Sequence, residues 1–170
     1  MKLKLLFLAF LVLSTSAIVE KSPVTIYMIG DSTMANRNLK NPKNKERGWG
    51  MMLGSFFPSD KVVVSNHAAS GRSTKSFINE KRWARVVALI KPGDYVFIQF
   101  GHNDEKKENP KLYTEPGGTF DDNLRKFVNE TRAKGGIPVL FNSIVRRKFC
   151  QDAAGQFTDS LLDTHGEYLL

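Results

Sequence analysis

The chain has 170 residues, 41% of them hydrophobic and 25% charged, which is enough for one domain with a buried core and excludes an intrinsically disordered protein. Cys150 is the single cysteine, so no disulfide can form within the chain. The formal net charge of +8 fits an anionic partner, but the basic residues are scattered and form no nucleic-acid-binding motif. We therefore expect an acidic polysaccharide, and not nucleic acid, as the partner.

The first residues have the three parts of a secretory signal peptide. Lys2 and Lys4 form a basic head, residues 5–13 are continuously apolar, and small residues follow at 14–17. The apolar part is too short to span a membrane as a helix. We expect residues 1–17 to be removed and residues 23–170 to form one domain of a secreted or periplasmic protein that is not bound to a membrane.

The rest of the chain alternates between strand-like and helix-like patterns. Apolar strand-like runs occupy residues 24–29, 62–65, 94–100 and 137–141. Apolar residues at helical spacing lie between these runs, at Trp49, Met52, Leu53 and Phe56, at Trp83, Val86, Val87 and Ile90, and at Phe120, Leu124, Phe127 and Val128. Thr119 is the expected N-cap of the last of these helices. The order predicts a parallel sheet with helices on both faces, which is a three-layer α/β/α fold.

The end of the chain is less regular. We expect residues 149–158 to be a loop and residues 159–170 to begin another helix. A doubly wound domain usually continues with a fifth strand and a closing helix. We therefore expect the fold to be incomplete at its C-terminus and the chain to be the N-terminal portion of a longer domain.

Polar residues follow three of the strand-like runs. Ser32, Gly71 and Asn103 come shortly after the first, second and third runs. Because ligands bind outside the carboxyl ends of parallel strands, we expect these residues to share one crevice. A serine hydroxyl can act as a nucleophile, and the N–H groups of a glycine backbone and an asparagine amide can stabilise charge on an attacked carbonyl oxygen. The three residues together predict a serine esterase.

The motifs that contain these residues resemble those of the SGNH (GDSL) hydrolases. They are Gly30–Ala35, Ala69–Ser73 and Gln99–Asp104. The resemblance implies a flavodoxin-like fold and a site without metal or cofactor. It also implies that Ser32 is the nucleophile and that Ser32, Gly71 and Asn103 form the oxyanion hole.

A narrower resemblance, to rhamnogalacturonan acetylesterases, comes from residues 48–50, 70–77 and 91–104. It implies a carboxylic ester hydrolase that removes O-acetyl groups from a plant cell-wall polysaccharide, pectic rhamnogalacturonan, through an acetyl-serine intermediate. Asp31, Arg72 and His102 are then candidates for substrate contacts, and we expect a monomer. Two alternatives stay open: another lipase- or thioesterase-type member of the superfamily, and a non-catalytic glycan-binding fragment.

The histidine that should act as the base is not evident. The family places it in an Asp-x-x-His motif near the end of the domain, whereas this chain contains only His67, His102 and His165. His165 follows Asp163 with one residue fewer than the motif requires, so we do not expect it to be the base. We expect His67 to pack or to bond locally. The catalytic Asp and His are therefore expected to be missing from this chain, which would have little esterase activity alone.

Overall fold

The computed structural model describes residues 22–40, 43, 45–146, 148–161 and 165–169. The expected signal peptide at residues 1–17 lies outside the described residues, and so does Asp163. Within the described part of the chain, no helix is both long and apolar enough to cross a membrane.

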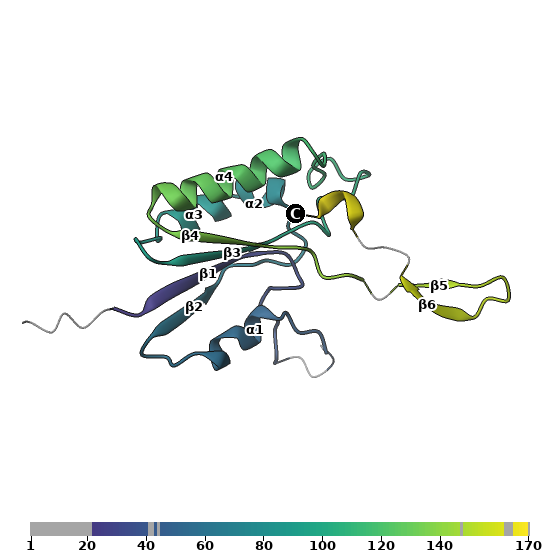
Figure 1. Cartoon of the computed structure of the whole chain (residues 1–170), viewed down its shortest axis with the longest axis horizontal. Helices are drawn as coiled ribbons and strands as arrows, with labels where there is room; N and C mark the ends of the chain where they lie inside the picture. The colour runs from purple at the N-terminus through teal and green to yellow at the C-terminus, as the bar shows by residue number, and fades with distance from the viewer. Residues whose placement is uncertain (1–21, 41–42, 44, 147, 162–164, 170) are drawn as a thin grey trace, which may run out of the picture.

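Four parallel strands form the central sheet, in the order β2-β1-β3-β4 (Figure 1). They are β1 (Val24–Gly30), β2 (Val62–Asn66), β3 (Tyr95–Gln99) and β4 (Ile137–Phe141). The structure confirms the four strand-like runs of the sequence, with ends that differ only by single residues. The order is the beginning of the flavodoxin-like order 2-1-3-4-5, in which β1 and β3 are neighbours and their connections lead to opposite edges.

Helices cover both faces of the sheet, which confirms the three layers expected from the sequence (Figure 1). One face carries α2 (Thr74–Asn79), α3 (Arg82–Val87) and α4 (Thr119–Ala133), and the other carries α1 (Gly50–Leu53) with the 3₁₀ helix η1 (Gly54–Phe56). Right-handed crossovers explain this division, because the chain moves to one side of β1 to form β2 and then returns to the other side for β3 and β4.

The main hydrophobic core lies between the sheet and helices α2 to α4. Alternate residues of the two central strands point into it, namely Tyr27, Ile29, Val96 and Ile98. From the helices they meet Phe77, Trp83 and Phe127, and the rings of Trp83 and Phe127 pack edge-on with centroids 5.0 Å apart. This packing holds α2 and α4 against the strands whose ends carry the polar motifs.

The face under α1 is covered less fully than the sequence predicted. Trp49 and Leu53 pack against the buried residues of this face, but Met52 and Phe56 are 59% and 75% exposed. The α-helix ends after one turn and continues as a 3₁₀ helix, whose three residues per turn rotate Phe56 away from the face that Trp49 and Leu53 share. The four residues at helical spacing therefore do not form one face of a single α-helix.

Helix α4 begins at the residue that the sequence predicted as its N-cap. Gly118 occupies the N-cap position, and Thr119 is the first helical residue. The Thr119 hydroxyl accepts a hydrogen bond of 2.8 Å from the backbone N–H of Glu115, which lies before the helix. Asp121 and Asp122 lie in the first turn, where negative charge stabilises the helix dipole, so charge replaces the expected side-chain cap.

The C-terminal part of the chain forms a hairpin instead of the expected loop. Strands β5 (Phe149–Gln151) and β6 (Phe157–Leu161) pair antiparallel and stand away from the main sheet (Figure 1). Cys150, on β5, is a partly exposed free thiol. The turn is closed by Asp152, whose carboxylate accepts hydrogen bonds from two later backbone N–H groups. Such an Asx turn offers the backbone an alternative to helix and could have been read from the sequence.

A short 3₁₀ helix, η2 (Gly166–Tyr168), follows the hairpin in place of the expected α-helix. Tyr168 is 4% exposed and packs edge-on against Phe120, with ring centroids 4.9 Å apart. Its hydroxyl donates a hydrogen bond of 2.7 Å to the carbonyl of Thr114, and burial raises the pKa of Tyr168 above its ordinary value. The buried tyrosine thus returns the end of the chain to the main core and brings His165 beside the sheet.

Gly48 precedes α1 where the chain passes close to the loop after β1. A Cβ at this position would lie 2.1 Å from the backbone oxygen of Ala35 and 2.7 Å from the carbonyl carbon of Met34. We expect Gly48→Ala to lower the free energy of unfolding by about 1–3 kcal/mol, the usual cost of overpacking. Urea unfolding followed by circular dichroism measures this change. In the control Gly166→Ala, the new Cβ would meet nothing within 4 Å; equal effects of the two substitutions would contradict the prediction.

Candidate active site

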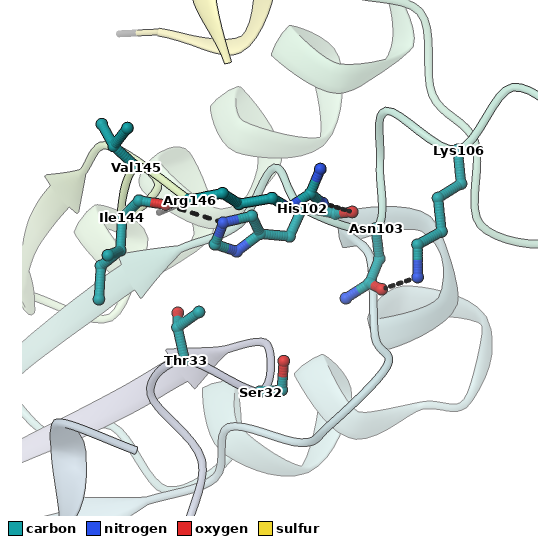
Figure 2. A pocket seen from close by; sticks show the side chains of 8 residues that line it. All are labelled: Ser32, Thr33, His102, Asn103, Lys106, Ile144, Val145 and Arg146. Carbon is teal, nitrogen blue, oxygen red and sulfur yellow. Dashed lines mark hydrogen bonds between the residues drawn. The ribbon is translucent and has the colours of Figure 1, made fainter. Parts of the chain in front are cut away.

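The carboxyl ends of β1 and β3 lie side by side, because Gly30 pairs with Gln99 in the parallel register. This is the switch point of the sheet, where ligands bind in folds of this type. A pocket of about 290 Å³ opens here (Figure 2), lined by Ser32, Thr33, His102, Asn103, Lys106, Ile144, Val145 and Arg146. The Ser32 hydroxyl points into the pocket from the loop after β1, and Asn103 lies on the wall that follows β3 (Figure 2).

The loop after β1 turns sharply and presents Ser32. The Asp31 carboxylate accepts two hydrogen bonds of 2.8 Å from Thr33, one from its backbone N–H and one from its hydroxyl. A Cβ at position 30 would lie 2.6 Å from the backbone oxygen of Gln99, so only glycine lets the two strand ends approach this closely. Strand β1 therefore ends beside β3, and the hydroxyl of Ser32 in the following loop faces the pocket.

The loop after β2 is tied to the loop after β1. Ala69 donates a backbone hydrogen bond of 2.9 Å to the carbonyl of Gly30. Arg37 bridges the two loops, since it donates to the backbone carbonyl of Ser32 at 3.0 Å and to the hydroxyl of Ser70 at 2.8 Å. Gly71 follows directly, with a φ of +76° that favours glycine. The loop that carries Gly71 is thus held against the loop that carries Ser32.

The loop after β3 is anchored by a buried carboxylate. Asp104 accepts hydrogen bonds from the backbone N–H of Thr74 at 2.9 Å and from the hydroxyl of Thr114 at 2.8 Å. Burial raises the pKa of Asp104 to about 6, although these hydrogen bonds favour its charged form. The anchor fixes Asn103, whose Nδ2 donates to the carbonyl of Arg72 at 3.0 Å and whose Oδ1 accepts from Lys106 at 2.8 Å.

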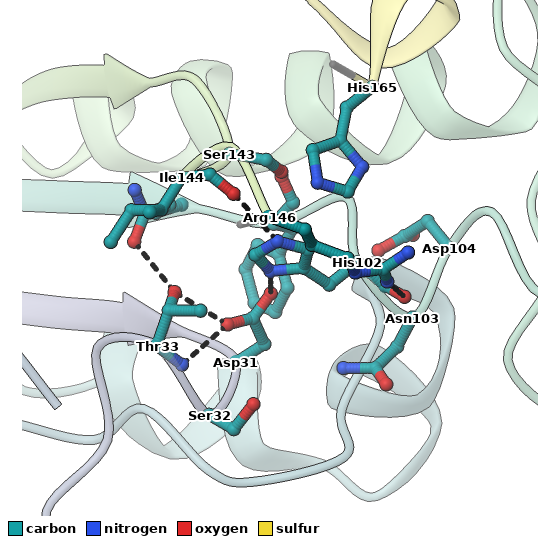
Figure 3. Close-up of polar contacts among 12 residues, drawn as sticks. Asp31, Ser32, Thr33, His102, Asn103, Asp104, Ser143, Ile144, Arg146 and His165 are labelled. Carbon is teal, nitrogen blue, oxygen red and sulfur yellow. Dashed lines mark hydrogen bonds and ion pairs between the residues drawn. The ribbon is translucent and has the colours of Figure 1, made fainter. Parts of the chain in front are cut away.

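His102 connects the loop after β1 with the loop after β4 (Figure 3). Its Nδ1 lies 3.3 Å from the Asp31 carboxylate, and its Nε2 lies 2.8 Å from the backbone carbonyl of Ile144. Both partners are acceptors, so the doubly protonated ring satisfies both contacts. Burial and the charge of Arg146 oppose that proton, but Asp31 and the Ile144 carbonyl outweigh them and raise the pKa of His102 above its ordinary value.

The three residues expected to contact substrate occupy different places. His102 lines the pocket. Asp31 is only 1% exposed and faces Thr33 and His102, so it can influence a ligand through these neighbours and not by direct contact. The Arg72 guanidinium lies outside the pocket lining, where Nε is 3.2 Å from the Glu80 carboxylate in a partly exposed ion pair.

The other histidines are bonded elsewhere. His165 is buried, its Nδ1 lies 2.6 Å from the Glu105 carboxylate, and its ring packs edge-on against His102 with centroids 4.4 Å apart. His67 bonds locally, as expected, with Nε2 at 2.9 Å from the hydroxyl of Ser65, and burial lowers the pKa of His67. Among the residues that the structure describes, no histidine is hydrogen-bonded to the Ser32 hydroxyl.

The loop after β4 forms a pocket wall that the sequence analysis did not identify. Ile144, Val145 and Arg146 line the pocket. Arg146 is 2.5 Å from the Glu105 carboxylate and donates a 3.2 Å hydrogen bond to the backbone carbonyl of His102. The rule that ligands bind at the carboxyl ends of parallel strands could have indicated this segment, because it follows a strand of the same sheet. No group of three or more His, Cys, Asp or Glu side chains suited to a metal ion occurs among the described residues.

Known proteins are similar to the part of this chain that forms the pocket. The family model described as GDSL-like Lipase/Acylhydrolase family matches residues 28–166. The chain is 38% identical over 148 residues to a rhamnogalacturonan acetylesterase of Bacillus subtilis, which covers 87% of this chain and 58% of that protein. It is also 38% identical over 121 residues to a protein of the same organism named "Probable rhamnogalacturonan acetylesterase", which covers 71% of this chain and 54% of that protein.

The solved structure of YxiM from Bacillus subtilis resembles this chain in fold over part of its length. It superposes with a TM-score of 0.65 at 31% identity, over 74% of this chain and 34% of that chain. YxiM is named an uncharacterized esterase. The present chain thus spans little more than half the length of the two acetylesterase-named relatives and about a third of YxiM.

The raised pKa of His102 leads to a prediction for stability against pH. Because the folded protein binds this proton more tightly than the unfolded chain does, the resulting stabilisation is complete below the ordinary pKa of 6.5 and is lost as pH rises through the raised value. We expect the difference in unfolding free energy between wild type and His102→Gln to shrink as pH rises from about 6 to 9. Urea unfolding of both proteins at several pH values measures it, and a difference that stays constant or grows would contradict the prediction.

Proposed function

Because the chain belongs to the GDSL-like lipase/acylhydrolase family, we propose that it supplies the nucleophile and the oxyanion donors of a carboxylic ester hydrolase. The observation that carries the proposal is the pocket at the ends of β1 and β3, which Ser32 and Asn103 line together (Figure 2). Ser32 offers a hydroxyl, and Asn103 offers a side-chain N–H. These are the groups that acyl transfer to a serine requires on either side of a carbonyl.

In the proposed reaction, Oγ of Ser32 attacks the acyl carbonyl carbon and the π electrons move to the carbonyl oxygen. The negative charge is received by the backbone N–H groups of Ser32 and Gly71 and by Nδ2 of Asn103. Collapse of this intermediate breaks the bond to the alcohol oxygen, which leaves as a hydroxyl by taking up the proton that the Ser32 hydroxyl gave up. The acetyl group then stays on Ser32 as an ester until water releases it as acetate.

The hydroxyl proton of Ser32 needs a base, and the described histidines are engaged elsewhere. His102 contacts Asp31 and the Ile144 carbonyl, and His165 contacts Glu105. We propose that neither histidine is the general base. Since loss of the base of a catalytic triad lowers turnover by roughly a millionfold, we expect these 170 residues alone to turn over slowly.

We propose an acetylated acidic polysaccharide, specifically pectic rhamnogalacturonan, as the substrate. Two relatives carry the name rhamnogalacturonan acetylesterase. His102, Lys106 and Arg146 give the pocket a basic lining, which suits a polymer that bears carboxylates. A second pocket of about 470 Å³, also lined by Ser32, extends over Trp49 and offers room for neighbouring sugar units. We further propose a secreted or periplasmic monomer.

A glycan-binding role without turnover is the alternative that the histidine geometry favours. The same basic pocket would then hold an acidic oligosaccharide, and the acetyl group would stay on the sugar. The two functions differ in whether a covalent acetyl-serine forms.

We expect 4-nitrophenyl acetate to transfer its acetyl group to Ser32. The 4-nitrophenolate group leaves without needing a proton, and slow deacylation in the absence of a base lets the acetyl-serine accumulate. Mass spectrometry of the peptide that contains residue 32 detects this product. Ser32→Ala should abolish the signal, whereas Ser55→Ala, which removes an exposed hydroxyl on η1, should keep it.

Equal acetylation of the Ser32→Ala variant would refute the assignment of the nucleophile. Binding of acidic oligosaccharides without any acetylation of Ser32 would instead support the glycan-binding alternative.

A further inference from the structure

The side-chain amide of Asn103 lies between a hydrogen-bond acceptor and a hydrogen-bond donor. Its Nδ2 donates to the backbone carbonyl of Arg72 at 3.0 Å. Its Oδ1 accepts from the Lys106 ammonium at 2.8 Å, as Figure 2 shows. An ammonium can only donate and a carbonyl can only accept, so both contacts require the same orientation of the amide. A flipped amide would place Nδ2 against the ammonium and Oδ1 against the carbonyl.

This orientation turns the N–H side of Asn103 toward Ser32. Nδ2 carries two hydrogens, and the Arg72 carbonyl accepts one of them. The second hydrogen is available to the pocket, because the nitrogen lies on the side of Ser32 and the oxygen on the side of Lys106 (Figure 2). Asn103 is only 4% exposed, so water has little access to replace a lost partner.

We propose that Lys106 is a positioning residue that holds the Asn103 amide ready to donate to the oxyanion. The proposal rests on the proposed esterase function and adds a residue to it. A cation at Oδ1 fixes the amide and draws electron density from it, which makes the N–H groups at the other end stronger donors. Lys106 acts through Asn103, because its ammonium lies on the far side of the amide from Ser32 (Figure 2).

The contacts around Lys106 leave the Asn103 amide as the partner of its ammonium group. The neighbouring carboxylate of Glu105 is bound by Arg146 at 2.5 Å and by His165 at 2.6 Å. Within the described part of the chain, Lys106 forms no ion pair, and its ammonium donates to the amide oxygen of Asn103. The backbone N–H of Lys106 also donates to the carbonyl of Asn103 at 3.4 Å, so a local turn keeps the two residues together.

Lys106 also lines the pocket, and direct contact with an anionic substrate is the competing role. The two roles change different quantities. A direct contact would raise KM for an acidic substrate and leave the reaction of a small neutral ester unchanged. A positioning role lowers the rate of acyl transfer from the neutral ester as well, because the oxyanion forms with every ester.

The acylation rate with 4-nitrophenyl acetate, a neutral ester, separates these roles. Lys106→Met keeps the aliphatic stem and removes the ammonium, and we expect the rate to fall about ten- to a hundredfold, the equivalent of one charge-assisted hydrogen bond. Asn103→Ala should cost about a hundred- to a thousandfold, as for other oxyanion donors. The double variant should lose no more than Asn103→Ala alone, because no amide remains to be positioned.

Two matched variants control for other effects of the substitution. Lys106→Arg keeps a charged donor and should retain most of the wild-type rate. Lys111→Met removes the charge of an exposed lysine outside the pocket lining and should leave the rate unchanged. A wild-type rate for Lys106→Met, or fully additive losses in the double variant, would overturn the proposal.

A second measurement does not depend on activity. The ¹⁵N resonance of the Asn103 side-chain amide should shift in Lys106→Met and stay in place in Lys111→Met. If it stays in place in both, the proposal is overturned. Failure of the wild type to react with the ester would refute the proposed function, and the amide resonance would still decide whether Lys106 orients Asn103.

Discussion

The contact between the Asp31 carboxylate and the His102 ring joins the ends of the two central strands. It depends on the close approach of β1 and β3, which a glycine at position 30 permits. The other ring nitrogen of His102 contacts the Ile144 carbonyl, so the end of β4 is drawn to the same point. The His102 ring, which follows β3, thus contacts the segments that follow β1 and β4, beside Ser32 and Asn103.

Polar contacts of side chains connect the loops around the pocket. Glu105 lies between Arg146 and His165, and Arg37 joins the loops after β1 and β2. The pair between Arg146 and Glu105 is only partly buried, with side-chain exposures of 30% and 20%, so it stabilises this loop arrangement less than a fully buried pair would. The fold beneath these loops is held differently, by the aromatic core between the sheet and helices α2 to α4.

The strands and the polar motifs could be predicted because both leave local patterns in the sequence. Apolar runs indicate the strands, and the rule for parallel sheets places the residues that follow them at one edge. The direction of a side chain leaves no such pattern. Nothing in the sequence distinguishes Lys106, which turns back to Asn103, from an ordinary solvated lysine, or shows that Arg72 turns away to Glu80.

Other differences between the predicted and the observed elements have local physical causes. The helical spacing from Trp49 to Phe56 assumed a regular α-helix, and the change to a 3₁₀ turn after Leu53 moved Phe56 off the shared face. The hairpin of β5 and β6 was missed because the composition of its turn is as polar as that of an ordinary loop, and only the Asp152 carboxylate marks it. Thr119 has a side chain that could cap a helix, but Gly118 occupies the N-cap position.

The place of the single cysteine makes this site accessible to spectroscopy. Cys150 lies on β5, shortly after the segment that forms the far wall of the pocket, and its thiol is partly exposed. A fluorophore or spin label can therefore be attached there without first removing competing thiols. Its signal would report whether a ligand in the pocket changes the surroundings of β5.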